Sequence, residues 1–251
     1  MSAKSVTMLA TERRHLMPNK SAYLLAFSPH PIDTELGIGG TVAHLTGQGK
    51  EVVYVVCTNG DKGSSNPALL PEKLAAMREQ EQLAAAKILG VKEVVFLRHP
   101  DLGLEETPDF RKEILRLILE YRPDIVATCD PYHRVYVSNR DHRVLGRVVL
   151  DNVWPTAQAP NAFLDLQTRG YKVHRVKEVW LWQSDQPNLK TDITDVFEIK
   201  KKAINCHTSQ RTAPENPGFE DQTLERAVTA AKGQNYQYGE NFYRLEILQR
   251  L

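Results

Sequence analysis

The sequence has few cysteines and no long apolar run. No stretch approaches the roughly 18 consecutive apolar residues of a membrane-spanning helix, because a charged residue interrupts every apolar run. The three cysteines, Cys57, Cys129 and Cys206, are odd in number and widely spaced, which excludes a disulfide scaffold and is typical of thiols in a reducing compartment. We therefore expect a cytoplasmic protein with no membrane partner.

An excess of charge of one sign is also lacking. The 251 residues include 32 basic and 31 acidic side chains, a net charge of +1, so we expect no nucleic-acid partner. The N-terminus has no apolar segment of the kind found in signal peptides, and we expect residues 1–20 to form a flexible lead-in. With 41% apolar residues and no linker or repeat, residues 21–251 are expected to fold as a single domain.

Short apolar runs alternate with stretches of good helix formers along most of the chain. The apolar runs end at turn residues, which is typical of buried strands. The expected strands cover residues 22–27, 51–57, 93–97, 124–128, 175–182 and 190–193, and the expected helices cover 39–47, 71–89, 111–121, 141–152 and 196–206. Strands that alternate with helices predict an α/β fold, with a mostly parallel sheet covered by helices on both faces.

Polar residues gather where three of the predicted strands end. These segments are Ser28–Glu35, Thr58–Gly63 and Cys129–His142. An open parallel sheet presents the loops after its strands along one edge, where they form a crevice. We therefore expect the chemistry of the protein at this edge.

Two histidines and an aspartate of these segments are candidate metal ligands. His30 and Asp33 are three positions apart in a turn, and His142 can join them from a later strand end. Two imidazoles and a carboxylate suit zinc, although another divalent metal would accept the same ligands, and they leave positions open for water and substrate. A single histidine beside a proline is more often an ordinary turn residue, so the surrounding motifs decide between the two interpretations.

Those motifs resemble the LmbE-like, PIG-L-type metal-dependent de-N-acetylases, which remove acetyl groups from N-acetylglucosaminyl compounds. The first family motif, His-Pro-Asp-Asp-x-Glu before a glycine-rich helix start, corresponds to His30–Gly40. Further matches follow in family order at Thr58–Gly63, Arg78 with Glu81, Pro100–Leu104, Arg122–Asp124, Arg140–Arg143, and Lys201 with His207–Gln210. The resemblance covers residues 22–210. It implies a Rossmann-like three-layer sandwich and a Zn²⁺ site at His30, Asp33 and His142.

Two positions depart from the family pattern. Ile32 stands where the family has the aspartate taken to be the general base, and isoleucine cannot accept a proton. Asn139 stands where the family has a histidine thought to stabilise the oxyanion or to protonate the leaving amine. Asparagine can donate a hydrogen bond to an oxyanion but delivers no proton near neutral pH. The metal ligands are therefore retained while both proton-transfer positions are changed.

A positioned general acid or base contributes about 10²–10⁴-fold to the rate, so another group would have to replace the lost functions. Glu35, Asp61, His133 and His207 are the candidates along the chain. For Glu35 we favour a structural role, because a carboxylate at a helix start interacts well with the positive end of the helix dipole.

Other residues near these motifs are candidates for catalysis and substrate binding. Asp141 is expected to orient Asn139 or a ligand histidine, or else to cap the following helix; with Asn139 it forms the predicted catalytic pair. By the resemblance, Arg78, Asp61 and Asp101 are predicted to bind substrate, although salt bridges to neighbouring helices are an alternative for Arg78 and Asp101.

Aromatic residues occur in two groups. The loop before Asn139 contains Tyr132, Arg134 and Tyr136, which would line the substrate mouth or simply pack. Trp180 and Trp182 alternate in a strand pattern and are expected in the core or at an interface.

The leading functional hypothesis is a zinc-dependent hydrolase that deacetylates the amide of a small N-acetylated, sugar-like substrate. The family resemblance implies that this substrate is a glycoside. The alternative is a catalytically impaired relative that keeps the fold and the metal cradle as a ligand- or partner-binding module. A third hypothesis is a metal hydrolase whose substrate supplies its own acid or base. Self-association and the role of the segment after Gln210 stay open.

Overall fold

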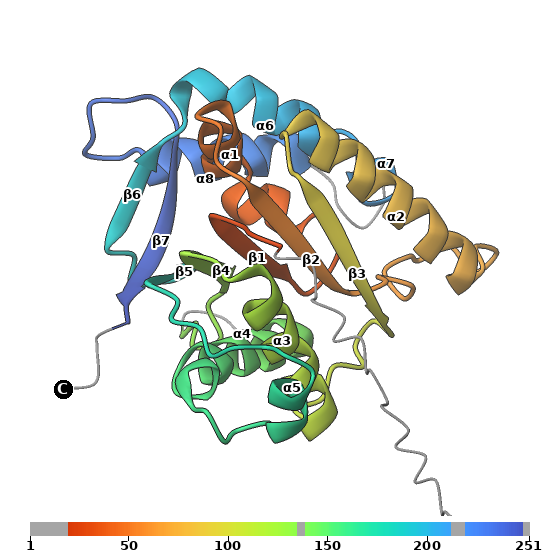
Figure 1. Ribbon diagram of the computed structural model, residues 1–251. Coiled ribbons are helices and arrows are strands. Elements are labelled where there is room, and N and C mark those ends of the chain that lie inside the picture. The colour runs from red at the N-terminus through yellow and green to blue at the C-terminus, as the bar shows by residue number, and fades with distance from the viewer. Residues whose placement is uncertain (1–19, 135–138, 212–218, 248–251) are drawn as a thin grey trace, which may run out of the picture.

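A seven-stranded sheet runs through the protein (Figure 1). The computed structural model describes residues 20–134, 139–211 and 219–247. The strands are β1 (Leu24–Ser28), β2 (Val52–Thr58), β3 (Glu93–His99), β4 (Ile125–Cys129), β5 (Glu178–Trp182), β6 (Leu189–Asp192) and β7 (Gly239–Glu246), in the order β3-β2-β1-β4-β5-β7-β6. Strands β1 to β5 are parallel, and β7 is antiparallel to both of its neighbours.

Helices cover both faces of the sheet, which confirms the predicted α/β sandwich. One layer contains α1 (Asp33–Gly47), α2 (Pro71–Ile88), α6 (Phe197–Ile204), α7 (Thr208–Arg211) and α8 (Phe219–Ala230), and the other contains α3 (Pro108–Tyr121), α4 (Arg140–Val153) and α5 (Leu164–Thr168) (Figure 1). Two short 3₁₀ helices, η1 (Thr156–Gln158) and η2 (Thr194–Val196), complete the described elements.

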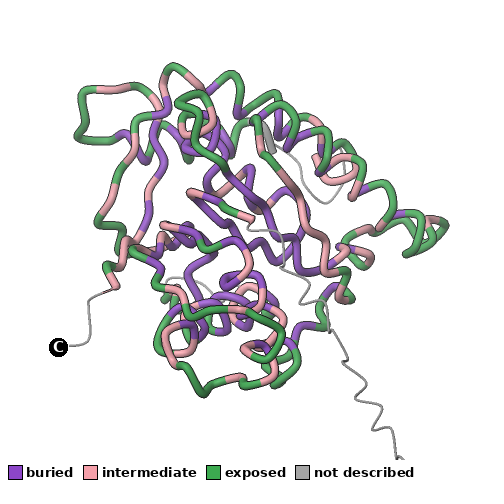
Figure 2. The backbone as a smooth tube through the Cα atoms, in the orientation of Figure 1, coloured by how far each residue is buried: buried purple, intermediate pink, exposed green. Residues whose placement is uncertain are grey.

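Alternate side chains of the central strands enter two different cores. In β1, Leu24 and Ala26 pack with α1 and α2, whereas Leu25 and Phe27 pack with α3 and α4. Successive side chains of a strand point to opposite faces, so a strand covered on both faces must be apolar throughout. The central strands β1, β2 and β4 are accordingly buried throughout, whereas the edge strands β3 and β6 are partly exposed (Figure 2).

The order of the strands places the candidate site. β1 pairs with β2 on one side and with β4 on the other, so the chain reverses its direction of winding between β1 and β4. In open α/β sheets ligands bind outside the carboxyl ends of the strands at such a switch point. The loops after β1 and β4 carry the three candidate metal ligands.

Several predicted boundaries are corrected by the structure. Helix α1 begins at Asp33 rather than Gly39, so the predicted metal motif forms its first turn. Helix α3 begins at Pro108, where the side chain of Thr107 accepts a hydrogen bond from the backbone N–H of Phe110. A threonine before a proline is a favourable helix start that outweighs the weak periodicity of these residues.

The segment after Gln210, whose role the sequence left open, supplies α8 and the inner strand β7. From β7, Glu240 reaches the middle of α1 and accepts the backbone N–H groups of Gly40 and Thr41, each at 2.8 Å. Lys200 of α6 pairs with Glu240 at 2.6 Å and donates to the carbonyl oxygen of Leu36 at 3.0 Å. Strand β7 therefore anchors α1, the helix that carries Asp33.

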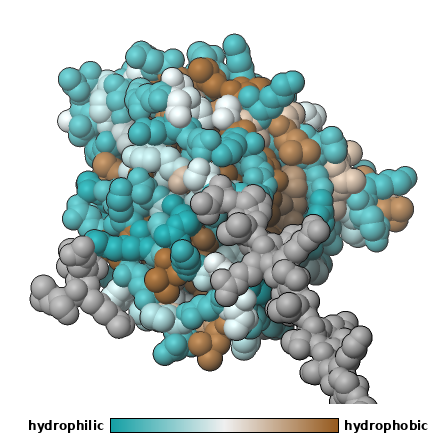
Figure 3. Space-filling view, in the orientation of Figure 1, coloured by the Kyte–Doolittle hydropathy of each residue, from teal (hydrophilic) through white to brown (hydrophobic). Residues whose placement is uncertain are grey.

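The remaining fold-level predictions concern tryptophans, membranes and domains. Trp182 is fully buried and Trp180 half-buried, as a core position requires. Within the described ranges no helix is both long and apolar enough to cross a membrane, and the face in Figure 3 is mainly hydrophilic with scattered apolar side chains. A single domain over 21–251 stays a prediction, and the predicted lead-in lies outside the described residues except for Lys20.

Candidate metal centre

His30 and Asp33 meet in the tight turn between β1 and α1. The Oδ2 atom of Asp33 accepts the backbone N–H of His30 at 3.0 Å and lies 3.0 Å from the Nδ1 atom of the same histidine. On the other side of His30, the Ser28 hydroxyl donates to the His30 carbonyl oxygen. The intervening Ile32 has a left-handed backbone, with φ 82°. These contacts turn the imidazole and the carboxylate toward each other.

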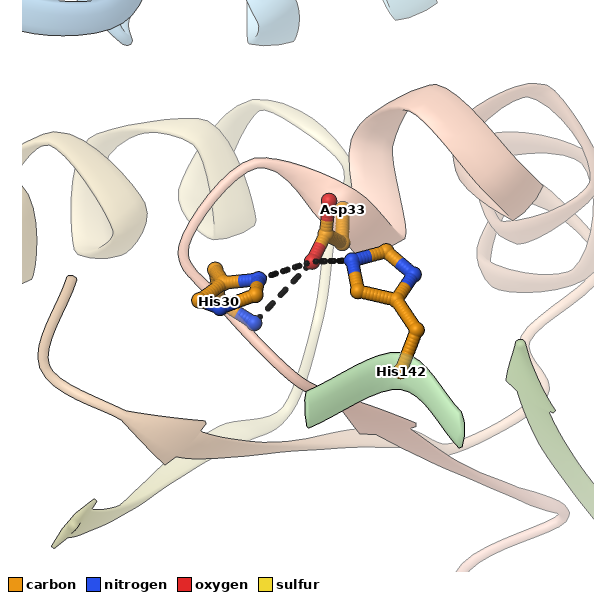
Figure 4. A group of neighbouring side chains, drawn as sticks. All are labelled: His30, Asp33 and His142. Atoms are coloured by element: carbon orange, nitrogen blue, oxygen red, sulfur yellow. Dashed lines mark hydrogen bonds and ion pairs between the residues drawn. The ribbon is translucent and has the colours of Figure 1, made fainter. Parts of the chain in front are cut away.

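His142 reaches the same carboxylate from α4. Its Nε2 atom lies 3.2 Å from Asp33 Oδ2, and the centroids of the two imidazole rings are 5.3 Å apart (Figure 4). One ligand atom from each of His30, Asp33 and His142 lies within 4.8 Å of the others. Their side chains are 11%, 13% and 12% exposed, so the group is mostly sheltered but still reaches solvent. The structure thus brings together the three predicted ligands.

The electrostatics of this group favour charged side chains while no metal is bound. Burial lowers the pKa of His142, but the attraction and hydrogen bonding of Asp33 outweigh it and raise the pKa to about 10. Burial opposes ionisation of Asp33, yet the two histidines hold its pKa far below the usual range. An ionised carboxylate therefore lies between two protonated imidazoles. A bound divalent cation would replace these protons as the positive charge beside the carboxylate.

Two further carboxylates contact His30 at its other ring nitrogen. Its Nε2 atom lies 3.1 Å from Asp101 Oδ1 and 3.3 Å from Asp141 Oδ2. Burial lowers the pKa of His30, but hydrogen bonds to Asp101, Asp141 and Asp33 raise it well above its ordinary value. Carboxylates on the outer nitrogen of a ligand histidine fix its tautomer and ring orientation, here with Nδ1 toward Asp33. Asp101 and Asp141 therefore form supporting contacts of the candidate site.

The contacts of Asp141 decide between its two predicted roles. Its carboxylate is fully buried and accepts the backbone N–H groups of Leu102 at 2.7 Å and Leu104 at 3.2 Å. The cap of α4 is instead Asn139, whose side-chain oxygen accepts the backbone N–H of Asp141 at 2.8 Å. Asp141 thus contacts a candidate ligand and not the helix end. The carbonyl of Asn139 is engaged in capping, so the predicted oxyanion contact would have to use its amide nitrogen.

Of the predicted substrate-binding residues, Asp61 and Asp101 lie in the loops after β2 and β3, and Arg78 lies on α2. Arg78 is buried, and its guanidinium donates to the carbonyl oxygens of Gly60 and of Gly63, the latter at 2.7 Å. Asp61 accepts the backbone N–H of Asp101 at 3.1 Å. These contacts tie the loop after β2 to α2 and to the loop after β3. The described bonds of Arg78 are to loop carbonyls, not the helix salt bridges of the alternative interpretation, and a direct contact with substrate stays a prediction.

Two of the candidate replacements for the lost acid and base lie together in a separate buried pair. Glu35 and His207 are both fully buried, and His207 Nε2 lies 3.4 Å from Glu35 Oε2. Glu35 also accepts hydrogen bonds from Gln82 Nε2 at 2.7 Å and from Thr34 at 3.1 Å. These described contacts join the two residues to each other, to Thr34 of α1 and to Gln82 of α2, and none involves the three ligand side chains.

The loop before α4 is described only in part. Tyr132 is 60% exposed, His133 is half-exposed, and the backbone N–H of Arg134 donates to Asp185 at 3.1 Å. The predicted substrate-mouth residue Tyr136 lies outside the described residues. A role for this loop in substrate binding stays a prediction.

Sequence reasoning missed one residue of the site, Gln82. It is fully buried in α2 and contacts both Ile32 and Glu35. The one signal in the sequence is its position four residues after Arg78 and eight after Leu74, on the buried face of the helix. Residues at such spacing share a face, but nothing in the sequence shows what a buried amide will contact.

Comparisons with known proteins agree with this geometry. The family model described as PIG-L, GlcNAc-PI de-N-acetylase, matches residues 25–153. The diacetylchitobiose deacetylase of Thermococcus kodakarensis is 36% identical over 187 residues, which cover 74% of this chain and 69% of that protein. A probable N-acetyl-α-D-glucosaminyl L-malate deacetylase 2 of Bacillus cereus is 30% identical and covers 76% of this chain and 84% of its own.

A solved structure extends the likeness to nearly the whole chain. The N,N'-diacetylchitobiose deacetylase from Pyrococcus horikoshii, complexed with its inhibitor MPG, superposes with a TM-score of 0.83 at 32% identity. The alignment covers 92% of this chain and 87% of that one. The residues matched by the family model, 25–153, include all three candidate ligands and the supporting Asp101 and Asp141. The chain therefore belongs to the PIG-L, or LmbE-like, family of metal-dependent de-N-acetylases.

Proposed function

We propose that this protein is a zinc-dependent deacetylase that hydrolyses the amide of an N-acetylated sugar or glycoside. The convergence of His30 Nδ1, Asp33 Oδ2 and His142 Nε2 is the observation that carries the proposal. The relatives support the substrate class, since they act on diacetylchitobiose and on an N-acetylglucosaminyl malate. Two imidazoles and one carboxylate are a common donor set of catalytic zinc.

The residues present fit such a metal. Both histidines offer one ring nitrogen to the shared carboxylate, and the outer nitrogen of His30 is held by Asp101 and Asp141. The donor side chains are 11–13% exposed, so they keep some of the solvent contact that a substrate needs for access. A zinc ion held there would supply Lewis-acid chemistry, polarising the amide carbonyl and making water more acidic.

The side chains of the chain itself would position and stabilise the reacting groups. Asp141 and Asp101 contact the Nε2 atom of His30, whereas Asp33 contacts its Nδ1 atom, so the two carboxylates would orient this ligand. Asn139 would donate a hydrogen bond from its amide nitrogen to the developing oxyanion. Because Ile32 accepts no proton, proton transfer is left to solvent, and the reaction should be slower than with a carboxylate at that position.

Acetate release from N,N'-diacetylchitobiose and from N-acetylglucosamine tests the proposal. Zinc-loaded protein should release acetate, and Asp33→Asn, which removes the central ligand charge, should abolish both zinc binding and activity. Elemental analysis of the same samples gives the metal content. A protein that holds one equivalent of zinc and releases no acetate from any N-acetylated sugar of a broad panel would contradict the proposal.

Ile32 and Asn139 favour one second candidate, a module that binds an N-acetylated ligand without hydrolysing it. The double variant Ile32→Asp with Asn139→His separates the two functions. If the natural chain binds a substrate and leaves it intact while the double variant hydrolyses it, the binding module is supported. If the natural chain already turns over at a rate close to that of the double variant, the binding module is excluded.

A further inference from the structure

The turn that carries two of the candidate ligands is conformationally strained. Ile32, between His30 and Asp33, has φ 82° and ψ −25°, in the left-handed region. A β-branched side chain is a rare outlier there, and such a conformation costs about 1–3 kcal/mol unless the surroundings impose it. Ile32 is only 3% exposed, so the surrounding protein encloses this residue.

A side chain from another helix holds the strained backbone in place. The backbone N–H of Ile32 donates to the Oε1 atom of Gln82 at 3.0 Å. At its other end, the same amide donates from Nε2 to Glu35 Oε1 at 2.7 Å. These two contacts fix which way the amide faces, because the reverse orientation would place its NH₂ group against the N–H of Ile32 and its oxygen against a carboxylate.

The acceptor of that amide is itself fixed. Glu35 is fully buried and accepts a further hydrogen bond from Thr34, with His207 Nε2 3.4 Å away. Both carboxylate oxygens of Glu35 are engaged, one by Gln82 and one by Thr34, and a buried polar group is costly to leave unpaired, so these contacts hold the carboxylate in place. The orientation of Gln82 is therefore imposed by side chains on α1 and on the segment before α7, and not by the turn alone.

We propose that Gln82 is a positioning residue of the metal centre, which holds the left-handed turn at Ile32 and thereby keeps His30 and Asp33 facing each other. The proposal rests on the proposed function, because it assigns Gln82 to the metal site of that function. If the backbone of Ile32 relaxes to a negative φ, the following peptide rotates and Asp33 leaves the position from which it contacts both histidines. Gln82 touches neither histidine and acts through the backbone.

Zinc affinity measured by competition with a chromophoric chelator tests this role. Gln82→Met keeps the side-chain volume and removes both polar atoms, and Gln82→Asn keeps an amide but draws it back by one methylene group. We expect each to lower zinc affinity by about 10–100-fold, the usual effect of losing an outer contact of a metal site. Gln80→Met, at an exposed position of the same helix, is the matched control and should leave affinity unchanged.

Relief of the strain distinguishes positioning from a general loss of structure. Glycine adopts positive φ freely, so in an Ile32→Gly background the turn no longer needs the hydrogen bond to Gln82 to keep its conformation. The Gln82 substitutions should then lower zinc affinity less than about 3-fold, well below the loss expected with Ile32 in place. An equal loss in both backgrounds would show that Gln82 only supports the fold and would overturn the proposal.

The two proposals fail in different ways. Wild-type affinity retained in both Gln82→Met and Gln82→Asn would overturn the positioning role and leave the proposed function standing. A natural chain that binds no zinc would overturn both. Thermal unfolding of the metal-free variants accompanies each titration, so that affinity is compared only among folded proteins.

Discussion

Replacing Asp141 by asparagine should weaken both the fold and the metal centre. The Asp141 carboxylate is fully buried; its Oδ2 atom accepts the N–H of Leu102 and lies 3.3 Å from His30, and its Oδ1 atom accepts the N–H of Leu104 at 3.2 Å. An asparagine can keep its oxygen on the side of Leu102 and His30 only by turning its NH₂ group toward the N–H of Leu104. One buried donor then loses its acceptor and faces another donor.

The size of the effect follows from these contacts. A hydrogen bond to a charged group contributes about 1.5–3 kcal/mol, and a buried donor without a partner costs about 1–3 kcal/mol. Allowing for partial relaxation, we expect Asp141→Asn to lower the free energy of unfolding by about 2–4 kcal/mol. For a domain of this size that corresponds to about 5–15 °C in Tm. Loss of the charge behind His30 should also reduce zinc affinity by about 10–100-fold.

Thermal unfolding with and without zinc, together with chelator competition, measures both effects. Asp130→Asn is a matched control, because Asp130 is also buried at the same edge of the sheet but accepts the backbone N–H of Tyr132, which an asparagine can do as well. If Asp141→Asn loses stability with no loss of zinc affinity, the orienting contact with His30 is refuted. If it behaves like the control in both assays, the whole argument from the buried carboxylate is wrong.

Three further predictions concern pH, catalysis and packing. In the metal-free protein, burial lowers the pKa of His142, but Asp33 outweighs this effect and raises the pKa from 6.5 to about 10. The stabilisation by the His142–Asp33 pair is therefore complete below about pH 6.5 and is lost as the pH rises through 10. Denaturant titrations of chelator-treated protein should show a falling free energy of unfolding in that window, and a flat profile would count against the pair. Ile32→Asp should raise kcat for an N-acetylated sugar by about 10²-fold or more, since it restores a proton acceptor beside the ligands; an unchanged kcat in a zinc-loaded variant would refute this. Gly37→Ala should destabilise the protein by about 1–3 kcal/mol in chemical denaturation, because the added methyl would lie 2.5 Å from the Trp182 ring, and unaltered stability would show that the ring can move aside.

The sequence was a good guide to the sheet and to the ligands for physical reasons. β1 and β2 are covered on both faces, so they stand out as continuous apolar runs, and their predicted bounds differ from the observed ones by one or two residues. The candidate ligands follow strands that meet at one edge, so topology alone brings His30 and His142 together once the sheet is parallel. The family motif then separated these histidines from ordinary turn residues.

What the sequence could not show are partners that lie far apart along the chain. Gln82 is 50 positions from Ile32, and Glu240 is 200 positions from Gly40. Neither spacing belongs to a local pattern such as a helix face or a hairpin. Arg78 illustrates the same limit, because its residue type favours an anionic partner, while the fold places the carbonyl oxygen of Gly63 within its reach.

The position of β7 bears on how the protein is made. In the part of the chain that the structure describes, β7 follows the other strands in sequence, yet it lies between β5 and β6 in the sheet and carries the Glu240 carboxylate that binds α1. During synthesis, therefore, Lys200 and the backbone N–H groups of Gly40 and Thr41 have no Glu240 partner until β7 has been made. A premature stop codon before this strand would leave a gap inside the sheet and leave the buried ammonium of Lys200 without its counter-charge. Although this change lies far from the histidines, it would remove the contacts that anchor α1, the helix that begins beside them.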